Sequence, residues 1–421
     1  MEVAGIETRA PTSPALSSSS HHAPVQDRIA SLDSLRALAL FGVIVMNIGA
    51  MVMRFAGRDV MAAVGPADFV SMGLDLALVQ GKARACFAFL FGLGFAILMM
   101  RSESKGADFG GFHVRRMLVL LTFGLFNQAF LFWGDILCLY ALLGLMLLPL
   151  RAWTDRAFLR AGLAFTLVPP LLVGLYEAIA GQAFPNLVDA DSAAETARGL
   201  AALTGPDYGK AILFNLPQAA MRYATDTGHM LVYALDVFGL FLLGAWTARR
   251  RIAFDVAAHA GLLRRIAWGC IPTGLVLSLV HASRLAGVEA DGAMHGVVTA
   301  AFVGLPILAL GYMAALALLF ARQARGLQAF LSPAGRMALT NYLMSGAIGG
   351  WIFYGYGLGA LHAFDFAGLN LLAVTLFLLL TLFSHFWLSR FRFGPAEWLW
   401  RSLTYGTIQP MRREPPLTAV A

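Results

Sequence analysis

Long apolar runs recur along this chain and limit what it can fold into. Each run holds roughly 20 residues, mostly Leu, Ala, Val, Ile, Phe and Gly, which is the helix length that spans the hydrocarbon core of a bilayer. Of the 421 residues, 59% are hydrophobic and only 13% are charged, whereas soluble domains hold roughly a quarter charged residues. The sequence therefore predicts an all-α integral membrane protein, with about ten transmembrane helices in one bundle and short amphipathic helices at the interface.

The apolar runs divide the chain into three parts. Residues 1–27, rich in Ser, Pro, Ala and His, are predicted to be a disordered cytoplasmic tail. Residues 28–393 are predicted to form the transmembrane domain, and 394–421 a cytoplasmic interfacial helix and tail. Residues 66–80 and 211–226 are shorter and amphipathic, so we expect them along the outer interface. The predicted spans are 33–53, 84–100, 116–133, 136–150, 158–180, 229–248, 262–283, 294–320, 336–354 and 368–389.

Basic residues predict the orientation of the chain in the membrane. With the N-terminus inside, 22 of the 31 Lys and Arg residues lie on the cytoplasmic side and eight in outer loops, in agreement with the positive-inside rule. Both termini are therefore expected in the cytoplasm. The net charge of +7 has the same origin and does not indicate a nucleic-acid partner, because the basic residues form no patch with aromatic side chains. The expected partner is the lipid bilayer, and the oligomeric state is left open.

Three polar residues share one face of the first predicted span. Asp33 and Arg36 are three residues apart, and Asn47 follows Arg36 by eleven, which is three helical turns and about 16 Å. An ionisable residue inside a bilayer is costly unless it is paired or faces a cavity. The stripe therefore indicates either a pathway or substrate site, or an Asp33–Arg36 ion pair at the cytoplasmic interface with Asn47 joining two helices.

Further polar residues stand near the ends of other spans. Asn127 lies in the third span, and Asp135 and Tyr140 follow at and beyond the turn into the fourth. Asp135 has the simpler alternative role of capping that fourth helix. Lys82 and Arg84, just before the second span, suit either a substrate site or the outer headgroup layer, which long basic side chains can reach. We predict one internal cavity lined by Asp33, Arg36, Asn47, Asn127 and Asp135.

Two features near the outer loops and the last span complete this set. His385, near the inner end of the tenth span, is a further candidate binding residue, although a lone His in a helix is more often a hydrogen-bonded core residue. The outer loop 182–228 is long and acidic. We expect this loop to form a small cap over an outward-facing cavity.

The segment SRFRFGPAEWLWRSLTYG follows the last span. Pro395 suits the first turn of a helix and Gly406 suits the position just after its end. A short helix with two Trp residues and flanking Arg residues is typical of a headgroup layer. The pattern predicts a helix over 395–405 at the cytoplasmic surface, with a Glu397–Arg401 ion pair at helical spacing.

Several motifs are absent from the sequence. It contains no P-loop, HExxH or GxSxG motif. Cys86, Cys138 and Cys270 all fall within apolar runs and have neither disulfide nor metal-ligand spacing. We therefore predict no metal and no tightly bound cofactor.

Four stretches of this chain have a distinctive pattern: RIASLDSLRALALFGVIVMNI, GKARACFAFLFGLGFA, RRMLVLLTFGLFNQAFLFWGDILCLYALLGL and GPAEWLWRSLTYG. They cover about a third of the chain and resemble the YeiB family of bacterial inner-membrane proteins. The GDIL-x-x-YA and GPxEWLWRxLTYG patterns are the most specific. The resemblance implies a multi-pass protein of the bacterial inner (plasma) membrane. The family commonly has His where this chain has Asn127.

That family is in turn distantly similar to membrane acyltransferases, namely the heparan-glucosaminide acetyltransferases and the polysaccharide O-acyltransferases. They share an opening of the LDxLR kind, in which the Arg matches Arg36 of this chain. In the polysaccharide O-acyltransferases a catalytic His follows, and its position here is Asn47. An amide cannot act as a general base at neutral pH, although it can orient a substrate or donate to an oxyanion.

Three functions follow as hypotheses. The first is transfer of an acyl group from cytoplasmic acyl-CoA to a periplasmic or lipid-linked acceptor, with His229, His281 or His295 replacing the missing base. The second is a transporter or flippase, and the third is a non-catalytic scaffold. The expected catalytic residues are Asn47, Asp135 and Asn127. The expected substrate-binding residues are Asp33, Arg36, Lys82, Arg84, Tyr140 and His385.

Overall fold

The computed structural model describes residues 25–54, 65–104, 106, 108–188, 192–285, 293–322 and 325–413. This part of the chain is helical throughout, apart from turns and one isolated β-bridge between Phe391 and Arg412. The predicted N-terminal tail falls almost wholly outside the described residues, as do the last residues, 414–421. The prediction of an all-α membrane protein is confirmed.

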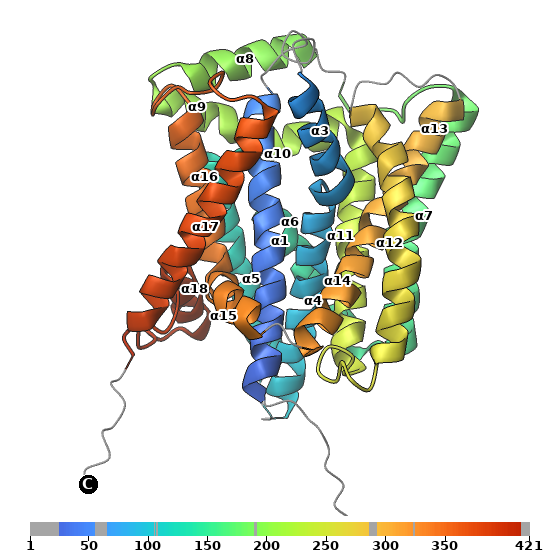
Figure 1. Cartoon of the computed structure of the whole chain (residues 1–421), viewed down its shortest axis with the longest axis vertical. Coiled ribbons are helices and arrows are strands. Elements are labelled where there is room, and N and C mark those ends of the chain that lie inside the picture. The colour runs from blue at the N-terminus through green and yellow to red at the C-terminus, as the bar shows by residue number, and fades with distance from the viewer. Residues whose placement is uncertain are drawn as a thin grey trace, which may run out of the picture.

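The long helices stand side by side and form one bundle (Figure 1). They are α1 (Val25–Met53), α4 (Lys82–Glu103), α5 (Phe109–Phe126), α7 (Asp155–Ala180), α11 (Thr227–Arg249), α12 (Ala260–Leu285), α14 (Gly304–Arg322) and α17 (Phe366–Arg390). The shorter helices are α3 (Pro66–Leu74), α6 (Leu137–Met146), α8 (Ser192–Thr204), α9 (Tyr208–Asn215), α10 (Gln218–Thr225), α13 (Ala293–Ala300), α15 (Arg325–Arg336), α16 (Ala338–Phe353) and α18 (Pro395–Tyr405). Two π-helical turns, η1 (Asp75–Val79) and η2 (Asn127–Leu131), and two 3₁₀ turns, η3 (Pro149–Ala152) and η4 (Ala301–Val303), join or extend them.

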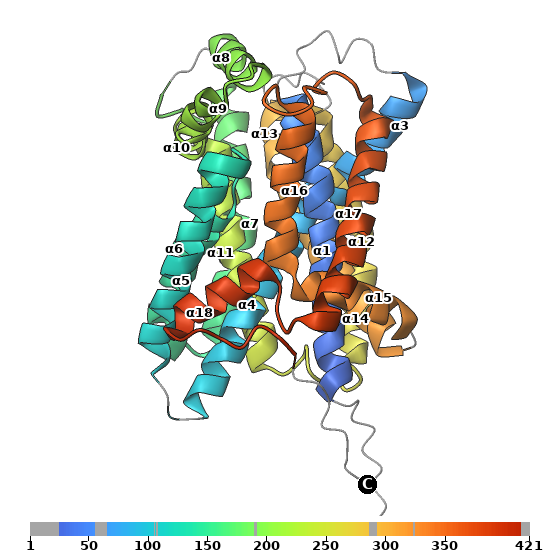
Figure 2. The ribbon, with the colours of Figure 1, turned by 90° about the vertical axis from the view of Figure 1, so that its left-hand side faces the viewer.

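Eight helices of the described chain are long and apolar enough to cross a membrane, compared with the predicted count of about ten. The other two predicted spans, 136–150 and 336–354, form the shorter helices α6 and α16. Both stand alongside the long helices of the bundle (Figure 2). Their shortness follows from turns at their ends, because η2 and η3 take up residues on either side of α6.

Residues 66–80 do not form a separate interfacial helix, so this prediction is wrong. Helix α3 leads through η1 into α4 and packs against α17. Asp68 accepts a hydrogen bond from the backbone N–H of Ala367 at 3.1 Å, and Asn370 donates to the Ser71 hydroxyl at 2.8 Å. Two polar side chains of this segment thus pair with α17, and the segment continues into the long helix α4.

Helices α8, α9 and α10 lie together over one end of the bundle, which we call the cap end (Figures 1 and 2). They come from the acidic loop 182–228, and α9 and α10 correspond to the predicted amphipathic segment 211–226. Helices α15 and α18 lie at the opposite end, which we call the α18 end. The first residues of α1 and the last described residues, after α18, share this end (Figure 2), as the predicted even number of spans requires.

Helix α18 has the predicted boundaries, 395–405, and lies across the bundle (Figure 2). Pro395 occupies its first turn, and Gly406 follows it in the left-handed region at φ 70°. The predicted Glu397–Arg401 pair is wrong, because the Glu397 carboxylate faces α16 and accepts hydrogen bonds there. The Arg401 guanidinium instead stacks 4.5 Å from the Phe393 ring centroid.

Candidate functional site

A cavity of about 1280 Å³ runs between the two ends of the bundle. Most of its lining residues come from the helices α1, α4, α5, α6, α10, α11, α12, α14, α15, α16 and α18, and a few from η1 and η4. At the α18 end the lining includes the five arginines Arg36, Arg101, Arg116, Arg336 and Arg401. At the cap end it includes Arg222, Tyr223, Asp226 and His229. The middle is largely apolar, with Phe87, Phe91, Leu98, Leu139 and Leu143 among its walls.

The structure brings most of the predicted site residues to this cavity. Those that line it directly are Arg36, Asn47, Arg84, Asp135 and Tyr140. Asp33 and Asn127 lie behind the lining, and each forms a hydrogen bond with a lining residue. Lys82 and His385 are not part of the lining. The predicted cavity thus exists, but two of its five predicted residues contribute only through a neighbour.

Asp33 and Arg36 form the ion pair that their spacing predicts. The Arg36 Nη1 lies 2.5 Å from the Asp33 Oδ1, and Asp33 is 5% exposed. The backbone at Asp33 is covered by α15, since a Cβ placed on Gly335 would lie 1.7 Å from the Asp33 carbonyl oxygen. The pair holds Arg36 at the cavity wall near the α18 end.

Asn127 and Asp135 form a second buried pair. The Asn127 amide donates to the Asp135 Oδ1 at 2.8 Å, and the Cys138 backbone N–H donates to the Asp135 Oδ2 at 2.8 Å. Asp135 therefore caps α6, as one prediction states, and also lines the cavity. Asn127 begins the π-helical turn η2, a type of local distortion that is frequent at functional sites.

Arg84 forms a buried ion pair that sequence reasoning missed. Its Nη2 lies 3.1 Å from the Asp236 Oδ2, and its guanidinium lies 4.3 Å from the Tyr233 ring centroid. The Tyr140 hydroxyl donates to the Arg84 carbonyl oxygen at 3.1 Å. Asp236 is fully buried within an apolar span. The signal was available, because an acidic residue in such a span needs a buried partner.

Lys82 and His385 lie elsewhere, which corrects their predicted roles. The Lys82 side chain is 1% exposed, and its Nζ donates to the Leu76 carbonyl oxygen in η1 at 2.6 Å. It therefore neither lines the cavity nor reaches a headgroup layer. His385 is exposed on α17, and its Nε2 lies 2.9 Å from the Phe330 carbonyl oxygen.

Five polar atoms of the lining are buried without a hydrogen-bond partner in the described chain. They are the Asn47 Nδ2, the Arg84 Nη1, the His113 Nδ1, the Arg222 Nε and the Ser278 Oγ. Buried polar groups are almost always satisfied in folded proteins, so a group of them around a cavity indicates a polar ligand. The five atoms belong to five different helices: α1, α4, α5, α10 and α12.

Three histidines were predicted as substitute bases, and the structure separates them. His229 and His281 line the same cavity as Asn47 and Asp135, whereas His295 does not.

Tyr223 also lines the cavity at the cap end. Burial and the neighbouring Tyr233 raise the pKa of Tyr223 to about 12, against the opposing effect of Arg222. The Tyr223 hydroxyl therefore stays protonated at neutral pH and cannot serve as a base.

Glu397 joins α18 to the first turn of α16. Its Oε1 accepts from the backbone N–H of Leu339 at 2.7 Å and of Thr340 at 3.0 Å, and its Oε2 accepts from the Thr340 hydroxyl at 2.6 Å. Burial raises the pKa of Glu397, while these hydrogen bonds act in the opposite direction. A carboxylate at a helix N-terminus also interacts favourably with the helix dipole.

We expect Glu397→Ala to weaken this connection, because it leaves three donors unsatisfied. A hydrogen bond to a charged group contributes about 1.5–3 kcal/mol to stability, so the loss of three is expected to cost about 3 kcal/mol or more. Thermal unfolding in detergent measures the loss, and limited proteolysis at Arg392 and Arg401 measures the release of α18. The exposed Ser389, replaced by Ala, is the control. Unchanged proteolysis in Glu397→Ala would contradict the capping role.

Metal binding finds no support in the part of the chain that the structure describes. It contains no group of three or more His, Cys, Asp or Glu side chains that could hold an ion. Cys86 is buried, Cys138 lines the cavity, and Cys270 is half-buried on α12. None of the three forms a disulfide in the described chain.

The fold and the cavity define a class: a multi-pass α-helical membrane protein with a polar-ended cavity through its bundle. Residues 247–407 match the family model described as DUF418, a protein of unknown function. The chain is 32% identical over 408 residues to the uncharacterized protein YxaH of Bacillus subtilis (strain 168), covering 92% of this chain and 97% of the relative. It is 29% identical over 411 residues to the uncharacterized protein YeiB of Escherichia coli (strain K12), covering 91% and 98%. No solved structure matches the chain.

The chain therefore belongs to the YeiB-like family of bacterial membrane proteins that contain the DUF418 region. This membership confirms the predicted family. The names of these relatives state no activity, so the function has to be argued from the cavity.

Proposed function

We propose that the protein is an acyltransferase of the bacterial inner membrane. It takes an acyl group from acyl-CoA at the α18 end, in the cytoplasm, and passes it to a periplasmic or lipid-linked acceptor at the cap end. The observation that supports this best is the continuity of one cavity, which joins five arginines at one end to two histidines nearer the other.

The α18 end suits the donor. Coenzyme A carries phosphate groups, and Arg binds phosphate oxygens with two parallel hydrogen bonds. The arginines of this end come from five separate helices: α1, α4, α5, α15 and α18. They surround the cavity mouth and do not form a stripe on one helix. The bias of Lys and Arg toward this end supports its cytoplasmic location.

The length and walls of the cavity suit the rest of the donor. Arg36 and Asn47 both line the cavity, and they lie about 16 Å apart along α1. An extended carrier arm bound at Arg36 can present its thioester near Asn47 and Arg84. Apolar and aromatic residues line the middle, as is usual where a pocket buries the apolar part of a ligand.

The reaction is an attack of an acceptor hydroxyl or amine on the thioester carbonyl. A new C–O or C–N bond forms, the C–S bond breaks, the acceptor proton passes to a base, and the departing thiolate takes up a proton. The unpartnered Asn47 Nδ2 and Arg84 Nη1 are donors suited to the oxyanion that develops on the carbonyl oxygen. Asp135 lines the same cavity, and the hydrogen bond from Asn127 holds its carboxylate in place. Asn47 itself cannot be the base, so one of the cavity histidines is required.

Transport is the second candidate, because the same cavity reaches both ends of the bundle. A transporter or flippase needs such a path but has no need of a thioester site. The scaffold hypothesis expects no cavity and every buried polar group paired. The two remaining candidates differ in whether acyl-CoA binds.

Acyl-CoA binding to the purified protein in detergent is the test. We expect saturable binding of acetyl-CoA or a longer acyl-CoA, weakened about tenfold or more in Arg36→Ala, since a charged hydrogen bond contributes about 1.5–3 kcal/mol. Arg36→Ala leaves Asp33 unpaired and can reduce folding, so Arg401→Ala, which removes an exposed guanidinium at the same mouth, is the second variant. Arg264→Ala, exposed on α12 outside the cavity, is the control.

Two outcomes contradict the proposal. One is the absence of binding for both short and long acyl-CoAs, which would favour transport and reduce Arg36 to a structural partner of Asp33. The other is equal weakening in Arg401→Ala and Arg264→Ala, which would indicate a general effect of charge on the micelle surface.

A further inference from the structure

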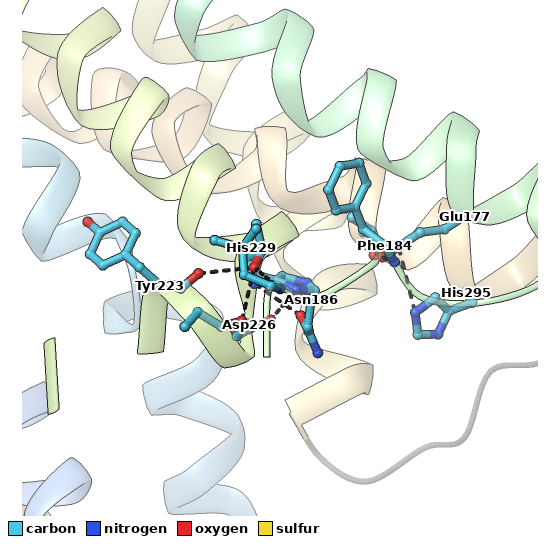
Figure 3. Close-up of polar contacts among 11 residues, drawn as sticks. Glu177, Phe184, Asn186, Tyr223, Asp226, His229 and His295 are labelled. Carbon is cyan, nitrogen blue, oxygen red and sulfur yellow. Dashed lines mark hydrogen bonds and ion pairs between the residues drawn. The ribbon is translucent and has the colours of Figure 1, made fainter. Parts of the chain in front are cut away.

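One histidine of the cavity is held by a carboxylate. The His229 Nδ1 lies 2.9 Å from the Asp226 Oδ1, and both residues line the cavity at the cap end (Figure 3). Asp226 immediately precedes α11 and His229 lies in its first turn, so a spacing of three residues brings their side chains together. When Nδ1 carries the hydrogen and donates to the carboxylate, Nε2 carries the lone pair that can accept a proton.

Arg222 stands beside this pair. It lines the cavity, and its Nε is buried without a hydrogen-bond partner in the described chain. The backbone N–H of Asp226 donates to the Arg222 carbonyl oxygen at 3.0 Å, which ties the end of α10 to the start of α11. A base, its carboxylate partner and an unpartnered cationic donor therefore share one wall of the cavity.

The contacts of three other histidines differ from those of His229. The His281 Nδ1 lies 3.1 Å from the Val298 carbonyl oxygen, which can orient the ring but supplies no negative charge to stabilise an imidazolium. The His295 Nε2 lies 3.6 Å from the Glu177 Oε2 (Figure 3). This pair resembles that of His229 and Asp226, but neither of its residues lines the cavity. His113 lines the cavity at the α18 end and faces the Gly144 carbonyl oxygen.

We infer that His229 is the general base of acyl transfer and that Asp226 positions it. Arg222 adds a further donor to Asn47 and Arg84, and together they stabilise the oxyanion. This inference rests on the proposed acyltransferase function. The acceptor enters from the cap end, and the His229 Nε2 removes the proton of its hydroxyl as the oxygen attacks the thioester carbonyl. The C–O bond forms, negative charge develops on the carbonyl oxygen near Arg222, the C–S bond breaks, and the imidazolium returns its proton to the thiolate.

Water can replace an unidentified acceptor, because it has the same attacking group. The experiment therefore measures the hydrolysis of acetyl-CoA by the full-length protein in detergent, following free coenzyme A by chromatography, together with acetyl-CoA binding. We expect His229→Gln to lower kcat about 100-fold or more, the usual contribution of a general base, with binding unchanged. Asp226→Asn is expected to lower kcat about tenfold with KM unchanged, because it alters only the orientation and charge stabilisation of His229.

His295→Gln is the matched control, since it removes a histidine with a carboxylate partner at the same end but outside the cavity. It is expected to leave both kcat and KM unchanged. Hydrolysis in His229→Gln within threefold of the wild-type rate would overturn the assignment. Binding of acetyl-CoA without hydrolysis by the wild type would overturn the assignment of the base while leaving donor binding intact. Absence of binding for both acetyl-CoA and longer acyl-CoAs would overturn the proposed function and this inference together.

Discussion

Gly92→Val is expected to prevent accumulation of the folded protein. A Cβ on Gly92 in α4 would lie 1.9 Å from the Phe241 carbonyl oxygen in α11, and a Cβ on Gly244 in α11 would lie 1.9 Å from the Phe89 carbonyl oxygen in α4. Small residues let membrane helices approach closely. Here each glycine lies directly against a backbone carbonyl oxygen of the other helix. Overpacking usually costs about 1–3 kcal/mol. The cost here should exceed that range, because backbone atoms cannot rotate away.

Size-exclusion chromatography of the detergent-extracted protein measures this effect, with Gly244→Val as an independent second variant. Gly94→Val is the matched control, because Gly94 is on the same helix and a Cβ there would have no other atom within 4 Å. A monodisperse peak of normal size for Gly92→Val would show that α4 and α11 can separate without loss of the fold.

Asp236→Ala is expected to cost about 3–5 kcal/mol of stability, since it leaves the Arg84 charge buried without its partner. Arg84 is 4% exposed and Asp236 is fully buried, so solvent screens neither group. The double variant Arg84→Met/Asp236→Leu removes both charges and should recover most of the loss, because apolar replacements of a buried ion pair are often neutral. The double variant should still lack the proposed oxyanion donor and so remain inactive.

Thermal unfolding in detergent of Arg84→Met, Asp236→Leu and the double variant forms a double-mutant cycle for this pair. Arg198→Ala provides the comparison, because Arg198 is 71% exposed and pairs with Glu195 on the cap surface. Exposed ion pairs contribute roughly 0–1 kcal/mol. A double variant less stable than either single variant would mean that Arg84 and Asp236 stabilise the bundle through separate contacts.

Helical periodicity predicted part of the site correctly. Arg36 and Asn47 share one face of α1 and line the same cavity, as their eleven-residue spacing requires. Asp135 caps α6 through Cys138, a contact between residues three apart. These predictions succeeded because each depends on distances within a single helix or turn.

Predictions failed where a side chain finds its partner far along the chain. Arg84 pairs with Asp236, 152 residues away, and Glu397 contacts Thr340, 57 residues away, although Arg401 stands at helical spacing. Lys82 was expected either at a substrate site or in the outer headgroup layer, yet the π-helical turn η1 presents the Leu76 carbonyl oxygen to it. Local spacing cannot decide between a near partner and a distant one, because the choice depends on which helices pack together.

The sequence by itself determined that this protein is a bundle of membrane helices, because apolar runs of this length can satisfy their backbone in a bilayer only as helices. It also determined the helix at 395–405 and the candidate residues on α1. Only the tertiary structure decided which polar groups are neutralised and which face the cavity unpartnered. Burial and hydrogen bonding are properties of several helices at once, so the pairing of His229 with Asp226 at the cavity wall, and the exclusion of His295 from it, required the packed bundle.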